Sequence, residues 1–130
     1  MLAVNASPSR LKIGLVAGEH SGATLGAALM QALREAHPQC EFVGVGGEKM
    51  RAAGLECWED AEALAVMGLT EVLKHLPRLL KLRRSLVEKF LASQPDVFVG
   101  IDAPDFNLGL AKRLRSRGLR TVQYVSPSVW

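Results

Sequence analysis

The apolar run at residues 97–101, VFVGI, limits what this chain can fold into more than any other segment. It shows no alternation of polar and apolar residues, which predicts a strand buried on both faces. Such a strand belongs inside a parallel sheet that helices cover on both sides. The run ends abruptly at Asp102. Because ligands of open parallel sheets bind beyond the carboxyl ends of the strands, Asp102 is predicted to lie beside a bound substrate.

A second carboxylate, Asp105, follows three residues later, and both carboxylates have a structural interpretation beside the functional one. The helical pattern that starts at Phe106 makes Asp105 a candidate cap for that helix. Asp102 would then cap the turn that Pro104 stiffens. The sequence leaves both interpretations open for this pair.

The chain alternates between short apolar runs and longer amphipathic stretches. We predict strands at residues 11–17, 40–45, 55–58, 97–101 and 119–125, and helices at 21–36, 48–53, 69–94 and 106–117. The helix at 69–94 is either continuous or divided near Pro77, residues 59–68 are expected to form a helical turn, and Gly118 is predicted to cap the last helix. This alternation implies right-handed crossovers and an α/β fold with a doubly wound, mostly parallel sheet.

The overall size and composition fit one globular domain. Residues 11–130 are predicted to form it after a flexible segment at 1–10, since 130 residues suffice for one core but not for two. The net charge of +3 selects no partner. Neither a signal peptide nor an apolar run of about 18 residues occurs, which predicts a cytoplasmic protein. Cys40 and Cys57 lack metal-ligand spacing and are expected to be buried free thiols.

The loop GEHSG at residues 18–22 is a second candidate site. Gly18 and Gly22 allow a ligand to approach the backbone closely at the start of a helix, where free N–H groups attract polar ligands. The loop matches neither dinucleotide nor P-loop spacing, and Glu19 would repel a phosphate, so sugar hydroxyls are the expected ligand. Alternatively, Ser21 is an N-cap and the glycines only permit close helix packing.

The stretch from Lys74 to Lys89 carries six basic residues and one acidic residue beside a stripe of leucines. A basic amphipathic helix of this kind can lie on an anionic lipid surface. It can equally pack its stripe on the core and expose its charges to water. Nucleic acid is not an expected partner, because aromatic residues do not interleave with the basic ones.

The motifs also bear on three other function classes. Ser126 lacks the GxSxG context of a serine hydrolase, so nucleophilic hydrolysis has no support. A dinucleotide-dependent oxidoreductase is disfavoured by the missing fingerprint. A noncatalytic flavodoxin-like binding or regulatory module, with a metal held by Glu19 and Asp102, stays open.

The ending SPSVW directly follows a predicted strand, which predicts that the chain is a piece of a longer protein.

Five segments, in order, resemble one enzyme family: LVAGEHSG, FVGVGGEKM, LAVMGLTEVL, PDVFVGIDAPDFNLGL and YVSPSVW. Together they are similar to the amino-terminal part of the lipid-A-disaccharide synthases, which are inverting glycosyltransferases. The resemblance implies the Rossmann-like amino-terminal half of a GT-B fold, with the nucleotide-sugar domain absent from this chain. It also implies a cytoplasmic protein that works at the inner membrane surface, for which the basic amphipathic stretch within residues 72–90 is the candidate contact.

The resemblance further implies transfer from UDP-2,3-diacylglucosamine to 2,3-diacylglucosamine 1-phosphate, giving a β-1,6 disaccharide and UDP. It implies no cofactor and no metal, and an isolated fragment without activity. Asp102 matches the family's general base. The residues matched to substrate binding are Gly18, Glu19, Ser21, Gly22, Asp105, Asn107 and Ser126, and of these Asn107 and Ser126 would orient or support the others. Ala23 departs from the family pattern, which has an aspartate there, and this puts the geometry of the first loop in doubt.

Overall fold

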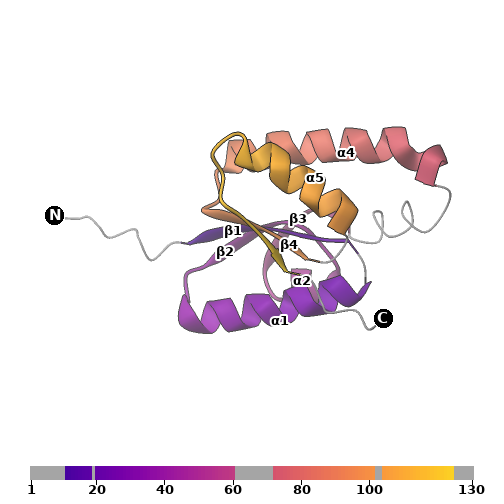
Figure 1. The fold of residues 1–130 in the computed structure, drawn as a ribbon. Coiled ribbons are helices and arrows are strands. Elements are labelled where there is room, and N and C mark those ends of the chain that lie inside the picture. Colours follow the sequence, from indigo (N-terminus) through magenta and orange to yellow (C-terminus); the bar gives the residue numbers. More distant parts are fainter. Residues whose placement is uncertain (1–10, 19, 61–71, 102–103, 125–130) are drawn as a thin grey trace.

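The computed structural model describes residues 11–18, 20–60, 72–101 and 104–124 (Figure 1). The elements are β1 (Lys12–Ala17), α1 (His20–Ala36), β2 (Glu41–Gly46), α2 (Glu48–Ala52), β3 (Leu55–Asp60), α4 (Val72–Ser93), β4 (Val97–Ile101), α5 (Pro104–Arg115) and β5 (Thr121–Tyr124). Strands and helices therefore alternate along the chain as the sequence predicts.

The strands form a parallel sheet in the order β3-β2-β1-β4-β5. The chain builds outward from β1 to β3 on one side, then crosses over and continues with β4 and β5 on the other. This arrangement confirms the predicted α/β fold with a doubly wound sheet. The direction of winding reverses between β1 and β4, and this switch point is where such sheets bind ligands.

Helices cover both faces of the sheet, α1 and α2 one face and α4 and α5 the other (Figure 1). The core on the α1 face contains Ile13, Leu15, Ala17, Ala23, Met30, Cys40, Phe42, Met50, Leu55, Val99 and Ile101. The core on the α4 face contains Val16, Val43, Val45, Leu86, Phe90, Phe98, Leu110, Ala111 and Leu114. β1 and β4 contribute to both cores, which explains why their sequences are almost entirely apolar.

Gly44 lies where β1 and β2 approach each other most closely. Its φ of +140° lies outside the range of ordinary side-chain-bearing residues. A Cβ at this position would overlap the carbonyl oxygen of Leu15 on β1.

The pairing of β2 with β3 shifts register between Gly44 and Val45, which leaves Trp58 as an extra residue on β3. The ring of Trp58 packs on Phe90 of α4 at a centroid distance of 4.8 Å.

Gly118 ends α5, as the sequence predicts. Its φ is +90°, its N–H donates to the Arg115 carbonyl at 3.0 Å, and the N–H of Leu119 donates to the Leu114 carbonyl at 3.1 Å. This pair of hydrogen bonds is the Schellman motif. Leu119 also packs on the α4-face core that contains Leu114.

Several predicted boundaries are wrong. α1 begins at His20, so Ser21 lies inside the first turn and is not the N-cap; residue preferences fix helix ends only to within one or two positions. α5 begins at Pro104, so Asp105 also lies inside a first turn and not at the N-cap position. Proline suits the first helical position because the N–H that it lacks would have no partner there. β3 continues through Glu59 to Asp60, where a helical turn was expected.

α4 is a single helix that continues through Pro77, which decides between the two expected forms of this segment. Pro77 lies near the amino end, where its missing N–H removes one hydrogen bond at most from a long helix. Packing of Leu86 and Phe90 on the core holds the remainder of the helix. Within the described ranges, no helix combines the length and apolarity that crossing a bilayer requires.

Candidate functional site

The carboxyl ends of β1 and β4 define the candidate site. Ala17 and Ile101, the last residues of these strands, are partners in the parallel ladder. Gly18, which follows β1, is buried. The amino ends of α1 and α5 lie on this same side of the sheet (Figure 1). The amino ends of helices carry partial positive charge, so a carboxylate or a polar ligand is favoured at this edge.

The structure places only part of the predicted site. Asp102, Glu19 and Ser126 lie outside the described residues, and their predicted roles stay predictions. Ser21 and Gly22 belong to the first turn of α1, and Asp105 belongs to the first turn of α5. These three residues therefore lie at the carboxyl edge of the sheet, in the first turns of two helices that flank the central strands.

Asn107 connects α5 to the ends of both central strands. Its side chain is fully buried, with 0% of the residue exposed. The amide nitrogen Nδ2 donates to the carbonyl oxygen of Val16 on β1 at 3.1 Å and to that of Ile101 on β4 at 3.4 Å. Asn107 therefore links the two strands at the switch point. Its partner on β4, Ile101, is the residue that directly precedes Asp102 in the sequence.

Glycines make room for the groups packed around this edge. A Cβ on Gly100 would lie 2.8 Å from the Cβ of Asn107 and 2.5 Å from Oε1 of Gln123 on β5. On the other face, a Cβ on Gly26 of α1 would lie 3.2 Å from Cδ1 of Ile101. α5 and α1 consequently both approach the end of β4 closely, so helices pack on this edge from both faces of the sheet.

The close packing of α1 at Gly26 fits the expectation that glycines permit helix packing, whereas the contacts of Gly100 and the two carbonyls that Asn107 holds were missed by reasoning from the sequence. One signal for Asn107 was present, because it shares helical spacing with the buried residues Leu110, Ala111 and Leu114. A polar residue at a core position of an amphipathic helix indicates a buried hydrogen bond. Ala23, whose effect on the first loop was in doubt, is the fourth residue of α1 and is buried in the α1-face core. The helix starts at His20 without a carboxylate at this position.

Two described groups with shifted pKa values lie outside this edge. Burial raises the pKa of the Cys40 thiol, which precedes β2 at the amino edge of the sheet. Burial, followed by the charge of Arg113, lowers the pKa of Arg83 between α4 and α5.

Both cysteines are free thiols, Cys40 buried and Cys57 half-buried. The described residues contain no cluster of three metal-ligating side chains. Glu19 and Asp102, the residues of the predicted metal alternative, lie outside the described residues.

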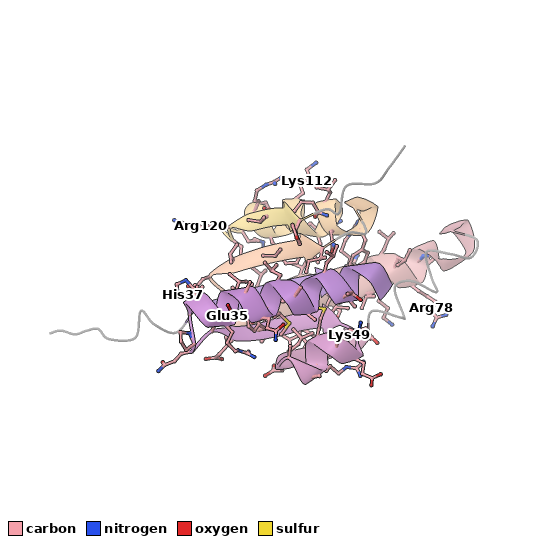
Figure 2. All side chains as sticks on the ribbon, turned by 90° about the horizontal axis from the view of Figure 1, so that it is seen from below. Glu35, His37, Lys49, Arg78, Lys112 and Arg120 are labelled. Atoms are coloured by element: carbon pink, nitrogen blue, oxygen red, sulfur yellow. The ribbon has the colours of Figure 1, made fainter. Side chains whose placement is uncertain are left out.

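The basic stretch of α4 divides between core and solvent. Leu86 and Phe90 are buried, and Leu79, Leu82, Val87 and Leu91 pack against the same core, so this part of the apolar stripe faces inward. The exposed positions include Arg78, Lys81, Arg84 and Lys89. Leu80 lies among them with 43% of its surface exposed. The amino end of α4 projects beyond the carboxyl ends of the strands, and Figure 2 shows Arg78 at that end, far from His37.

Residues 13–130 match the family described as lipid-A-disaccharide synthetase. The chain is 64% identical over 119 residues to the lipid-A-disaccharide synthase of Xanthomonas campestris pv. campestris strain 8004, covering 92% of this chain and 27% of that protein. It is 62% identical over 120 residues to that of Chromohalobacter salexigens and 60% identical over 120 residues to that of Sodalis glossinidius. Both of these matches cover 92% of this chain and 31% of the relative. The chain therefore spans about three-tenths of the length of the curated relatives that it matches.

Proposed function

Because the chain belongs to the lipid-A-disaccharide synthetase family, we propose that it forms the acceptor-binding part of a lipid-A-disaccharide synthase. The acceptor is 2,3-diacylglucosamine 1-phosphate and the donor is UDP-2,3-diacylglucosamine. The donor is held mainly by a second Rossmann-like domain of a GT-B enzyme, so residues 1–130 alone are inactive. The reaction uses no cofactor and no metal.

In the proposed reaction the 6-hydroxyl of the acceptor attacks the anomeric carbon of the donor. A carbon–oxygen bond forms there as the bond to the diphosphate oxygen breaks, which releases UDP and inverts the anomeric centre. The hydroxyl proton passes to the carboxylate of Asp102, the general base. Gly18, Glu19, Ser21, Gly22, Asp105, Asn107 and Ser126 bind the acceptor or support the residues that do.

The observation that carries this proposal is the pairing of Ala17 with Ile101 at the switch point. Asp102 directly follows Ile101 in the sequence, and the first-loop segment directly follows Ala17. Two segments remote in the sequence thus leave the sheet side by side, at the edge where doubly wound folds bind their ligands. Positively polarised helix ends at the same edge favour the carboxylates and the polar sugar.

The full-length protein tests the proposal directly. We expect it to convert the UDP-sugar and the acceptor into equimolar UDP and β-1,6 disaccharide, with undiminished turnover in the presence of EDTA. The matched control is the 130-residue chain, for which we expect no turnover. A full-length protein that forms no disaccharide would refute the proposal. Saturable Mg²⁺ binding with no transfer would instead favour the metal-holding regulatory module.

We also propose that the exposed basic face of α4 contacts the anionic inner membrane surface. Arg78, Lys81 and Arg84 are exposed, and Leu80 lies among them partly exposed and able to insert shallowly between headgroups. The amino end of this helix projects on the side of the candidate site, so contact there would bring the site close to its lipid substrates.

Liposome flotation at low salt tests this contact. The triple variant Arg78→Glu, Lys81→Glu, Arg84→Glu of the full-length protein should lose most of its binding to vesicles containing anionic lipid, since each basic group near such a surface contributes about 1 kcal/mol. The control carries Lys112→Glu, Arg113→Glu and Arg117→Glu, at exposed residues near the carboxyl end of α5 and in the turn that follows it, and its flotation should be unchanged. Equal flotation of the first variant and the wild type would contradict the proposal.

A further inference from the structure

We propose that Asn107 is a positioning residue that fixes the end of β4 from which Asp102 continues, and so sets where the general base stands relative to the acceptor hydroxyl. The inference rests on the proposed function of Asp102. It assigns to Asn107 an action through the backbone in place of direct contact with the substrate, because its side chain is fully buried.

The hydrogen bonds of Asn107 act on both sides of the switch point. A side-chain amide nitrogen has two N–H groups, and here one donates to Val16 of β1 and the other to Ile101 of β4. The Ile101 carbonyl belongs to the peptide unit that joins Ile101 to Asp102, and a peptide unit is planar. A hydrogen bond to this oxygen therefore restrains the plane from which the chain continues to the base.

The position of the amide group is itself fixed by its surroundings. Asn107 shares a face of α5 with Leu110, Ala111 and Leu114, all buried in the α4-face core. The missing side chain of Gly100 leaves the space that Asn107 occupies, and a Cβ there would lie only 3.0 Å from its Cγ. An amide held in this way does not change rotamer without disturbing the core. A residue that orients a reacting group needs this rigidity.

The amide also costs more to bury than an apolar side chain of the same size would. Desolvating an amide is repaid only when its hydrogen bonds are made, and a leucine at this position would need none. A leucine has the same branched arrangement of heavy atoms, although its methyl groups are bulkier than the amide, and it would suit an apolar helix face. The hydrogen bonds to the two carbonyls offset the cost of burying the amide at this core position.

The test measures Asn107→Leu in the full-length enzyme. We expect kcat to fall about 10- to 100-fold, as for a small displacement of a catalytic group, with the KM for the acceptor changed less than about threefold. The pH at which kcat falls to half of its maximum on the acid side should also shift. Asn107→Ser keeps one donor and should recover part of kcat. Leu108→Ser changes an exposed neighbour on α5 and serves as the control with wild-type kinetics.

A double-mutant cycle with Asp102→Asn separates positioning from general damage to the fold. If Asn107 acts through the base, Asn107→Leu has no further effect on kcat once Asp102→Asn is present. An equal loss in both backgrounds, or wild-type kcat in Asn107→Leu itself, overturns the positioning role. Near-normal turnover of Asp102→Asn alone overturns the base assignment instead. The two failures therefore give different results.

Discussion

With Asp102 as the proposed general base, Asp102→Asn in the full-length protein should lower kcat by about 10²- to 10⁴-fold, the usual contribution of such a base. Asparagine has the size of aspartate and can still form hydrogen bonds, but it cannot accept the proton of the acceptor hydroxyl. The KM values should change little, because the charge of the base matters chiefly as the proton is transferred. Steady-state kinetics of UDP release, with both substrates varied, measure the effect.

Asp96→Asn is the matched control for this prediction. Asp96 precedes the opposite end of the same strand, where its carboxylate accepts a hydrogen bond from the backbone N–H of Lys12 at 2.8 Å. The substitution is the same, but it lies at the amino edge of the sheet, so kcat should stay at the wild-type value. Thermal unfolding of both variants establishes that they are folded. A folded Asp102→Asn enzyme with near-normal kcat would refute the role of the base.

Gly44→Ala should destabilise the protein by about 3 kcal/mol or more, the largest stability effect that we expect from a single methyl group. Two costs combine at this position. The φ of +140° is strained for any residue with a side chain, and the added Cβ would overlap the Leu15 carbonyl oxygen. Relief would require β1 and β2 to separate in the middle of the sheet. Thermal unfolding followed by circular dichroism measures the loss.

Gly118→Ala separates these two costs. Gly118 also has a positive φ, of +90°, but nothing lies within 4 Å of the position that its Cβ would take. Its substitution should therefore show the backbone cost alone, about 1 to 2 kcal/mol. Similar losses for the two variants would mean that β1 and β2 separate without penalty at Gly44, contrary to the prediction.

The sequence predicted the layers of this fold well, because burial leaves a direct mark on composition. The run VFVGI predicted a strand covered on both faces, and the alternation of strands with helices indicated parallel crossovers. The starts of α1 and α5 were less predictable, because residue preferences at helix ends differ by less energy than packing supplies. Continuation of α4 through Pro77 has the same explanation, since tertiary contacts of the later turns outweigh one lost hydrogen bond.

The candidate site was predictable only in part. Its predicted location follows from the point where the VFVGI strand ends, and the sheet order places the reversal of winding between that strand and β1. The hydrogen bonds of Asn107 to Val16 and Ile101 join residues far apart in the sequence, and no local pattern encodes their geometry. The φ of Gly44 was equally inaccessible, because a glycine inside a strand does not reveal which backbone conformation it adopts.

The pairing of β1 with β4 has a consequence for synthesis on the ribosome. Ile13 finds its partner Val97 only after α1, β2, β3 and α4 have been translated. Until then the nascent chain carries a half-finished sheet whose future central strand is an open edge, with unpaired backbone groups and uncovered valines on its second face. Late arrival of β4 therefore makes the emerging polypeptide vulnerable to aggregation until the central ladder closes.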